Sequence, residues 1–408
     1  MKRFLLVIFI FSASGILNSA VTHYNNILIG DRAATMGGAY IALSDDTSGT
    51  YYNPAGITQP NSGGISGSVN VLHAQHITYV NAIRNADWDR SSLELMPNFF
   101  GLVQTFGKHS FGAAISTPDS FVQHQDQVFS NIPATATQEA IDKFSLNLHA
   151  NDGTYIFGPT YSYKMNDEMA VGITLGYNYR SSRAQQDQTI WYPNATYENS
   201  YSSATWSEQG IQPKVGFLWN VNPKLSLGAV IDHVFIFLSN YSADVKTKAR
   251  ASNDMVMTQT SSKSKRNTTT HLGLGSAYQV AKPLLIALDI NIYFPPSKDI
   301  FFPNGYNFVM NWALGTEYAI NEKNTVRMGF YTNKTNMPMP TAQTTLVSHI
   351  DMYGVSAGYS LNYESTSFTI GLIYSAGIGD SQIYSDINEV VQAKNYSMTG
   401  VLSTNYKF

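Results

Sequence analysis

The residues best suited to catalysis or metal binding are scattered along this chain. His73 and His76 have the spacing of a metal-binding pair on a helix, but on an extended strand side chains three apart point to opposite faces. His124 and His149, with Ser and Asp residues nearby, are loose candidates for an enzyme site at the level of the long connections. No three-ligand zinc site is suggested, because the remaining histidines occur singly.

Other motifs that could carry chemistry are also incomplete. Asp45 and Asp46 are adjacent, and adjacent carboxylates seldom converge on one reacting atom, so we expect solvated turn acids there. Gly37 and Gly38 lack the strand, helix and lysine of a phosphate-binding loop. The chain has no cysteine, which excludes disulfides, thiol nucleophiles and cysteine ligands. We therefore expect no enzyme activity, no metal and no cofactor.

The composition is unusual for a water-soluble protein. Charged residues make up 13% of the chain, about half the usual globular share, whereas 26 tyrosines bring the aromatic share to 13%. The formal charge is −3, so no positive field draws nucleic acid. The surface of the folded chain is expected to be largely apolar.

The amino terminus has the pattern of a secretory signal peptide at residues 1–20. Lys2 and Arg3 precede an apolar run, Phe4–Phe11, which is too short for a membrane helix of about 20 residues. Val21 is the expected mature start, with cleavage after Gly15 as the alternative. No later stretch approaches the length of a membrane helix, so a mature chain within a bilayer must form a closed barrel.

Alternation of apolar and polar residues supports that barrel, because successive side chains on a strand point to opposite faces. From Phe308 to Ile320, one face is aromatic and aliphatic while the other holds small and polar residues. Met169–Arg180, Val326–Tyr331 and Tyr396–Phe408 divide in the same way. The last strand ends on the aromatic Phe408, which resembles the signal that barrel-assembly machinery reads. A soluble β-sandwich is disfavoured, since its outward faces should be polar.

Short and long connections alternate along the chain, as they do in bacterial barrels with short periplasmic turns and long outer loops. Their number predicts about 14 antiparallel strands over residues 61–408, with both ends of the barrel periplasmic. The short turns are expected at Gly107–Ser110, Asn166–Glu168, Asn220–Lys224, Val280–Pro283, Asn321–Asn324 and Asn362–Ser367. The long connections are expected at His76–Ser91, Pro118–Asp152, Ser181–Ser207, Ser239–Asn267, Pro295–Gly305, Asn333–Ser348 and Ala376–Lys394.

Residues 21–60 do not alternate and are rich in small side chains, which allow close packing and sharp turns. About forty residues is too few for an independent domain, so we interpret this segment as a plug, or hatch, inside the lumen. It contains Gly30-x-Arg32-Ala33, then Met36-Gly37-Gly38-Ala39 followed by Tyr40, Ile41 and Ala42, and later Asn53-Pro54-Ala55.

These motifs resemble the FadL/TodX family of outer-membrane transport proteins. Weaker fragments extend the resemblance over most of the mature chain, at Val215–Leu227 and at Ala313–Phe330. The resemblance implies a barrel stoppered by a hatch, and diffusion-driven uptake of long-chain fatty acids or aromatic hydrocarbons. It also implies capture by apolar outer loops, a pocket near the hatch and lateral exit where the third strand, Ser110–Thr117, is kinked. Pro118 is expected to end that strand.

The resemblance places the pocket beside Met36–Ala42 and the hatch turn at Asn53–Ala55. Apolar segments of the outer loops, one of them a helical face at Gln138–Leu148, are candidates for ligand capture, although packing of the loops on one another explains them equally well. The candidate substrate-binding residues are Met36, Ala39, Tyr40, Ile41, Phe111, Ile115, Ile141, Phe144, Phe301 and Phe302, and the hatch residues are Gly37, Gly38, Asn53, Pro54 and Ala55.

Two other functions remain open. Related barrels of the type IX secretion system carry a similar Asn-Pro-Ala amino terminus and serve protein secretion, and an adhesin or antigen would use the long loops rather than the lumen. A barrel enzyme ranks last. The expected location is the outer membrane of a Gram-negative-type cell with both termini periplasmic. The expected partners are hydrophobic small molecules, membrane lipid and, during biogenesis, the assembly machinery.

Overall fold

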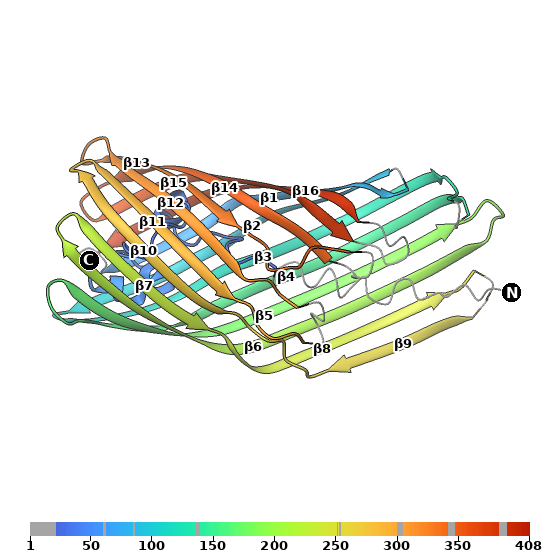
Figure 1. The fold of residues 1–408 in the computed structure, drawn as a ribbon, viewed down its shortest axis with the longest axis horizontal. Coiled ribbons are helices and arrows are strands. Elements are labelled where there is room, and N and C mark those ends of the chain that lie inside the picture. Colours follow the sequence, from blue (N-terminus) through green and yellow to red (C-terminus); the bar gives the residue numbers. More distant parts are fainter. Residues whose placement is uncertain are drawn as a thin grey trace.

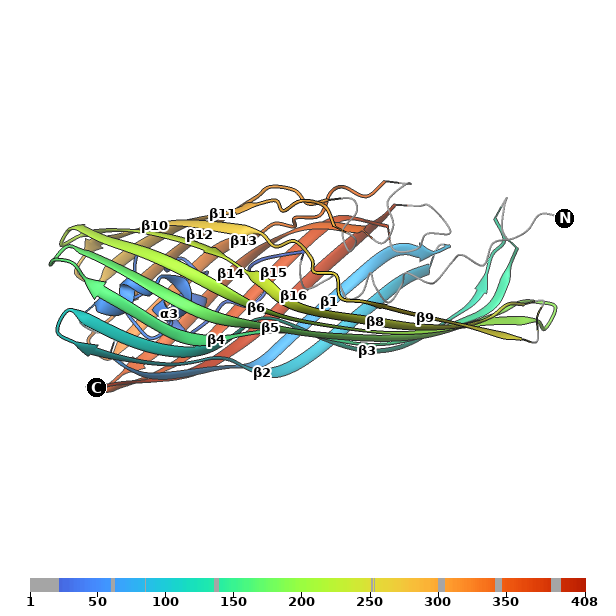
Figure 2. The ribbon, with the colours of Figure 1, turned by 90° about the horizontal axis from the view of Figure 1, so that it is seen from below.

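The computed structural model describes residues 22–59, 63–84, 86–135, 139–250, 252, 254–299, 305–341, 347–382 and 390–408. Fourteen antiparallel strands close into a transmembrane barrel, and two further strands form a hairpin outside the closed circle (Figure 1). The amino-terminal segment lies inside the barrel (Figure 2). Among the described residues, no helix has the length and apolar character needed to cross a bilayer.

The strands follow the order of the chain, apart from the extra hairpin. They are β1 (Gly64–Ile83), β2 (Ala86–Phe106), β3 (His109–Ile132), β4 (Ile141–Lys164), β5 (Met169–Trp191), β6 (Tyr197–Asn222), β7 (Leu225–His233), β8 (Phe235–Lys248), β9 (Met255–Ser262), β10 (Thr270–Ala281), β11 (Leu284–Phe294), β12 (Val309–Ala319), β13 (Asn324–Asn333), β14 (Val347–Asn362), β15 (Thr366–Gln382) and β16 (Val391–Lys407).

The barrel closes where its first strand meets its last. Gly64 of β1 lies opposite Lys407 of β16, so the barrel begins and ends at the same rim. Strand β6 is long enough to pair with two successive strands, β7 along its second half and β8 along its first half. Among the described strands, β9 pairs with β8 alone and therefore has a free edge.

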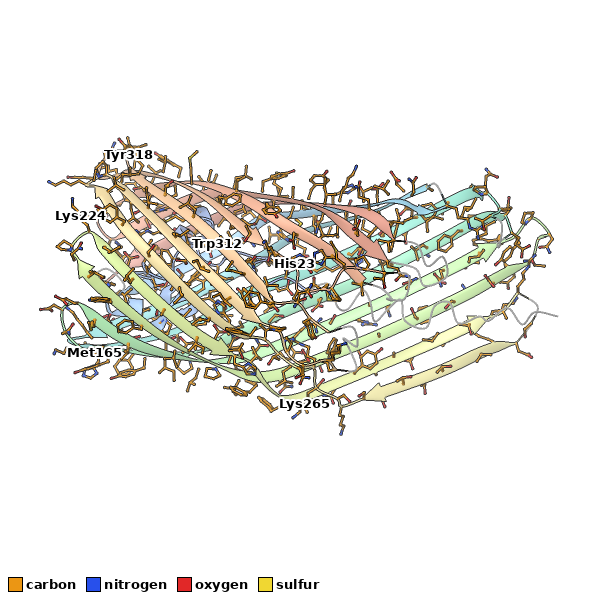
Figure 3. All side chains as sticks on the ribbon, viewed as in Figure 1. His23, Met165, Lys224, Lys265, Trp312 and Tyr318 are labelled. Atoms are coloured by element: carbon orange, nitrogen blue, oxygen red, sulfur yellow. The ribbon has the colours of Figure 1, made fainter. Side chains whose placement is uncertain are left out.

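The alternation predicted from the sequence is confirmed. Phe308, Met310, Trp312, Leu314, Tyr318 and Ile320 all lie on the exposed outer wall, whereas Asn311 and Ala313 are buried toward the lumen. Tyr318 marks the short-turn rim in Figure 3, and Trp312 lies farther along the wall. An apolar outer band around a polar interior is the arrangement that a bilayer requires.

All six predicted short turns are present, because each falls between the end of one strand and the start of the next. Most of the predicted long connections, however, are not loops. Strands β1 and β2 continue to Ile83 and Ala86, and β5 and β6 continue to Trp191 and Tyr197. Their polar residues keep pairing beyond the apolar band, so β3–β6 with β8 and β9 project well past the other strands (Figures 1 and 2).

Two local predictions were wrong. Residues 141–148 form the start of β4 rather than a helix, because Phe144, Leu146 and Leu148 recur with period two and pack in one buried cluster. Pro118 does not end the third strand, since β3 runs to Ile132. Proline is tolerated there because β3 has already parted from β2 and loses no ladder bond on that side.

Three short helices form the part of the hatch that lies against the barrel wall: α2 (Arg32–Thr35), α3 (Gly49–Tyr52) and the 3-10 helix η2 (Pro54–Thr58). The first described residues run up the lumen, where the carbonyl of Thr22 accepts from Asn336 and the ring of His23 contacts the carbonyl of Ile350. They lie toward the long connections, whereas Phe408 follows β16 at the opposite rim. The expected signal peptide, 1–20, and Phe301 and Phe302 lie outside the described residues.

Candidate functional site

An ion-pair cluster fixes the first helix of the hatch to the wall. Arg32 donates from Nε and Nη2 to the two carboxylate oxygens of Glu317 at 2.8 and 2.9 Å, and Arg327 donates to the same carboxylate at 2.6 Å. The third nitrogen of Arg32, Nη1, donates to Asp45 at 2.5 Å. A bidentate guanidinium–carboxylate pair fixes orientation as well as distance, so α2 is held in one position on β12 and β13.

The Asn-Pro-Ala turn is a second attachment point. Asn53 caps η2 by accepting from the backbone N–H of Ala55 at 3.1 Å, and its amide donates to the carbonyls of Ile41 and Phe217 at 2.8 and 3.0 Å. Asp289 of β11 accepts from the backbone N–H groups of Tyr40 and Ile41 at 2.7 and 2.8 Å. Asn53 and Asp289 therefore hold the Tyr40–Ile41 bend from two sides of the lumen.

Asp45 and Asp46 are half-buried in the hatch and are not the freely solvated turn acids expected from the sequence. Asp45 forms an ion pair with Arg32, and Asp46 accepts hydrogen bonds from the backbone N–H and the hydroxyl of Ser48. Burial acts to raise the pKa of Asp45, but the charge of Arg32 outweighs it and the pKa lies below its usual value of 3.8. Burial raises the pKa of Asp46, and the negative charge of Asp31 raises it further. The two neighbouring carboxylates thus contribute to stability with opposite signs.

Substitution of these two acids is expected to separate their contributions. Asp45 stabilises the hatch above pH 3.8, and this stability is lost as the pH falls through its lowered folded-state pKa. Asp45→Asn should therefore cost about 1–2 kcal/mol at pH 7, between the values for exposed and buried pairs, and speed amide exchange in the hatch roughly tenfold. Asp46→Asn, the matched control, should leave exchange unchanged or slower, because an ionised group with a raised pKa opposes folding at pH 7. Equal acceleration by both substitutions in hydrogen-exchange mass spectrometry would contradict this assignment.

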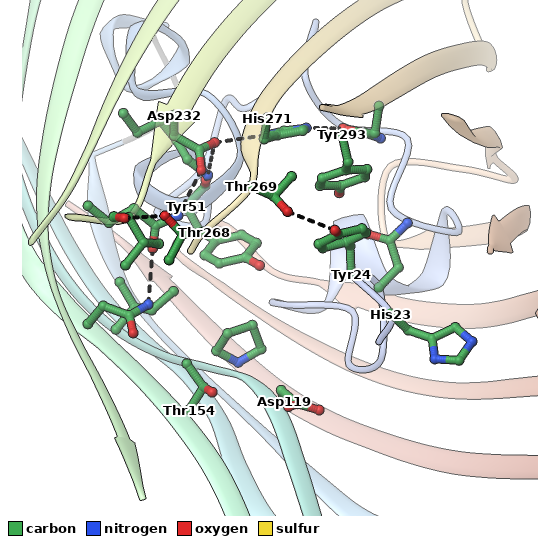
Figure 4. A pocket seen from close by; sticks show the side chains of 18 of the residues that line it. His23, Tyr24, Tyr51, Asp119, Thr154, Asp232, Thr268, Thr269, His271 and Tyr293 are labelled. Carbon is green, nitrogen blue, oxygen red and sulfur yellow. Dashed lines mark hydrogen bonds and ion pairs between the residues drawn. The ribbon is translucent and has the colours of Figure 1, made fainter. Parts of the chain in front are cut away.

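Directly above the hatch lies a cavity of about 230 Å³. It is bounded by the hatch residues Leu28, Gly37, Gly38 and Ile41. Inward side chains of several strands, among them Asp232, His271 and Tyr293, also line it (Figure 4). Its other lining residues include Tyr24, Tyr51, Tyr52, Pro118, Asp119, Thr154, Ile156, Lys214, Asp232, Arg266, Thr269, His271, Asn291 and Tyr293. The wall is therefore a mixture of aromatic, aliphatic and hydrogen-bonding groups rather than uniformly apolar.

Three stacked rings form one side of the cavity. The rings of Tyr24 and Tyr293 are nearly parallel, with centroids 3.8 Å apart. The ring of His271 also stacks on Tyr293, with centroids 4.7 Å apart. The hydroxyl of Tyr24 is held by Thr269 at 2.9 Å, as Figure 4 shows. Flat ring faces favour planar ligands, because offset stacking adds to the free energy of burial.

A chain of polar contacts forms another side. The ring of His271 contacts Asp232 at 2.8 Å and Asn291 at 2.8 Å, and Asp232 also accepts from Gln212 at 2.8 Å. The ammonium of Lys214 lies 3.6 Å from Asp232 and 4.7 Å from the ring centroid of Tyr51. The charges of Lys214 and Asp232 compensate each other, so an uncharged ligand on this side of the cavity leaves neither of them as an isolated ion.

The wall beside the cavity is split between β2 and β3. The two strands pair only from Phe99 opposite Ser116 to Phe106 opposite His109; above that point β2 pairs with β1 and β3 pairs with β4. The ladder between β3 and β4 also shifts register between Ser116 and Asp119. Pro118 and Asp119, which line the cavity, therefore lie where the backbone seam opens.

Side chains, not backbone bonds, bridge this seam. Glu94 of β2 accepts from the hydroxyl of Ser120 at 2.7 Å and from the backbone N–H of Val122. Arg90 donates to the amide oxygen of Gln123 at 2.9 Å, and Gln125 donates to the carbonyl of Asp89. Side-chain bridges can be exchanged by rotamer changes, whereas a strand ladder must be broken cooperatively. This seam should therefore open more easily than the paired part of the β2–β3 ladder.

The candidate substrate-binding residues lie in four different places. Ile41 lines the cavity together with Gly37 and Gly38, whereas Met36, Ala39 and Tyr40 are fully buried beside it, where the hatch packs on the wall. Phe111 and Ile115 are 50% and 53% exposed on the outer wall. Ile141 and Phe144 belong to an apolar cluster in the projecting strands. The sequence set is therefore brought together only at the hatch.

Sequence reasoning missed Lys214, Asp232, His271 and Tyr293. A usable signal was present, because charged residues within membrane strands are rare and costly and face the interior when they occur. Lys214 and Asp232 occupy lumen positions of apolar strands, directly opposite each other in the β6–β7 register. Their convergence with His271 on β10 required the register of a third strand.

Comparison with solved structures identifies the fold. The P. putida toluene transporter TodX superposes with a TM-score of 0.63 at 13% identity, covering 93% of this chain and 98% of that one. The Ralstonia pickettii toluene transporter TbuX gives 0.62 at 14% identity, with 93% and 98% covered. A Pseudomonas aeruginosa FadL homologue gives 0.59 at 14% identity, with 95% and 99% covered. No sequence-family profile and no curated protein sequence matches the chain.

At this level of identity the similarity concerns the fold. The chain has the FadL/TodX barrel fold over nearly its whole length, which confirms the fold that the sequence resemblance implied.

Proposed function

We propose that this protein is an outer-membrane channel for diffusion-driven uptake of small hydrophobic molecules. The observation that carries the proposal is the cavity above the hatch, whose lining reaches the open seam at Pro118 and Asp119. A closed hatch below and a weak seam beside one cavity favour lateral release into the membrane rather than passage along the axis. The shared fold with two toluene transporters supports the same class of cargo.

The size of the cavity narrows the cargo. An engineered cavity of roughly 150 Å³ binds benzene, and sites for drug-sized ligands span about 300–1,000 Å³. A cavity of about 230 Å³ therefore suits a single substituted ring better than an extended long acyl chain. Among the substrates suggested by the resemblance, the ring stack of Tyr24, Tyr293 and His271 also favours aromatic hydrocarbons.

Filling the cavity tests the proposal. Thr154 lines the cavity near the seam, so Thr154→Trp should reduce uptake of a radiolabelled single-ring hydrocarbon by about an order of magnitude. Tyr155→Trp is the matched control, because Tyr155 is the next residue on β4 and is exposed on the outer wall. The assay uses cells that lack other hydrophobic channels. Equal uptake by the two variants at equal surface expression would overturn the assignment of this cavity to transport.

One feature favours a second function, contact with another protein or cell. Among the described strands, β9 has one edge without a partner, and its residues Met255, Val256 and Met257 are 60%, 60% and 57% exposed. Unpaired strand edges and exposed apolar patches are common interaction sites. Replacing the three residues with Ser should leave hydrocarbon uptake unchanged and should reduce adhesion of the cells. Unchanged adhesion would count against this second function.

A further inference from the structure

Two histidines face each other across the projecting part of β3 and β4. His124 lies directly opposite His149 in the antiparallel register, and both side chains are exposed. Their Nδ1 atoms are 2.9 Å apart, with ring centroids 5.2 Å apart and ring planes inclined by 55°. Within the described chain, no other two histidine rings share a hydrogen-bond contact. From this geometry we infer a surface site for a divalent first-row transition metal ion, with His124 and His149 as its protein ligands.

The position of the pair is outside the apolar band. On β4 the outward residues Tyr161, Phe157 and Tyr155 are exposed aromatics of the bilayer-facing wall. Beyond Tyr155, the outward positions toward the tip are Gly153, Asn151, His149, Asn147, Ser145 and Lys143, none of which is apolar and large. A hydrated ion can therefore reach the two rings without crossing lipid.

The ligand geometry suits the ion with a small adjustment. Two imidazole nitrogens bound to one ion by bonds of about 2.05 Å lie about 3.4 Å apart on tetrahedral Zn²⁺ and about 2.9 Å apart at adjacent positions of tetragonal Cu²⁺ or Ni²⁺. The observed 2.9 Å between the two Nδ1 atoms fits a tetragonal ion. For Zn²⁺ the gap must open by about half an ångström, which rotation of two exposed rings provides without moving the strands. In the metal-free pair one ring donates its Nδ1 proton to the other. When the ion binds, that ring loses its Nδ1 proton to water and takes up a proton at Nε2, so both rings stay neutral and both Nδ1 lone pairs bind the ion.

The donor set defines which ions bind. The described residues contain no group of three His, Cys, Asp or Glu residues placed to hold a metal, so water completes the coordination sphere. Imidazole suits Cu²⁺, Ni²⁺ and Zn²⁺, whereas Mg²⁺ and Ca²⁺ require oxygen ligands. By the general order of divalent affinities, Cu²⁺ should bind more tightly than Ni²⁺ or Zn²⁺. A bound ion would join β3 to β4 above the membrane.

Titration of the purified full-length barrel with Cu²⁺ tests the site, after removal of any affinity tag and chelation of trace metal. We expect one ion per chain, an electron paramagnetic resonance spectrum with nitrogen superhyperfine splitting, and at least tenfold weaker binding of Zn²⁺. His124→Gln and His149→Gln should each weaken Cu²⁺ binding at least tenfold. The affinity of the double variant for Cu²⁺ should lie within tenfold of the affinity of each single variant. The two rings bind the ion together, so losing one ring already removes most of the affinity.

His109→Gln is the matched control, because His109 is also an exposed histidine of β3 but lies opposite Tyr163. It should bind Cu²⁺ like the unsubstituted protein. Gel mobility of the unheated barrel shows that each variant is folded. Stoichiometric Cu²⁺ binding that survives in both His124→Gln and His149→Gln would overturn the proposal, and so would an equal loss of binding in His109→Gln. The proposal would also be wrong if the unsubstituted protein bound Cu²⁺ no more tightly than the double variant. None of these results depends on whether the lumen transports hydrocarbons.

Discussion

Joining β2 to β3 across the upper seam is expected to stop hydrocarbon uptake. The chain has no cysteine, so Glu94→Cys with Ser120→Cys creates one pair of thiols at a contact that now bridges the seam. A bifunctional methanethiosulfonate that spans the gap joins the two thiols through reducible disulfides. It should lower uptake by at least about tenfold, because the seam can no longer widen beside the cavity. Reduction of the cross-link should restore uptake, measured in the same cells and with the same radiolabelled ring compound.

The matched control joins the same strands where they already pair. Thr105 and Ser110 have side-chain oxygens 2.9 Å apart in the β2–β3 ladder, so Thr105→Cys with Ser110→Cys adds a covalent link without closing any opening. Uptake should change little. If the upper cross-link also leaves uptake unchanged, lateral exit at this seam is wrong, while the result with Thr154→Trp still decides whether the cavity carries the cargo.

The second large effect is expected from one methyl group added to the barrel wall where the hatch packs against it. A Cβ atom on Gly329 of β13 would lie 2.1 Å from the backbone nitrogen of Gly37 and 2.2 Å from the carbonyl carbon of Met36. Neither backbone atom can move without displacing the hatch, so Gly329→Ala should cost about 2–3 kcal/mol of docking free energy. The undocked hatch then becomes one to two orders of magnitude more populated, since each 1.4 kcal/mol is tenfold.

Single-channel conductance in a planar bilayer measures that change. Gly329→Ala should show frequent openings to a larger conductance, and cells that express it should become sensitive to polar antibiotics normally excluded. Gly67→Ala is the control. A Cβ atom on Gly67 would lie 3.8 Å from its nearest neighbour, the ring of Phe100, which is an ordinary van der Waals contact. Conductance traces that do not differ between the two variants would show that the hatch tolerates the methyl group or does not seal the lumen.

The same close packing explains why glycine recurs on lumen positions of this barrel. A Cβ on Gly216 would lie 2.0 Å from the amide oxygen of Asn53, and one on Gly228 would lie 2.5 Å from the carbonyl of Ile41. The wall thus accepts the hatch backbone at van der Waals distance. In the sequence, these residues looked like ordinary small residues of a lumen face.

Local rules predicted the wall well and its upper part poorly. Alternation from Phe308 to Ile320 identified the outward face, and Asn, Gly and Pro marked every short turn. The same rules suggested long loops where β3–β6 continue to pair, because polar strands outside a bilayer lose the apolar signal while keeping the ladder. Pro118 was interpreted as a strand end, since the absence of a β2 neighbour cannot be detected from residue types.

The sequence alone determined which face of each strand contacts lipid and which faces the lumen. Low charge, period-two alternation and the rhythm of turns require a closed barrel in a membrane, because only closure pairs every backbone group there. Which side chains meet inside was decided by the tertiary structure. Lys214, Asp232, His271 and Tyr293 come from four strands, and His124 meets His149 only through the β3–β4 register. A shift of one residue in any ladder would turn these side chains to the opposite face. Local patterns could therefore mark single residues as unusual but could not show which of them meet.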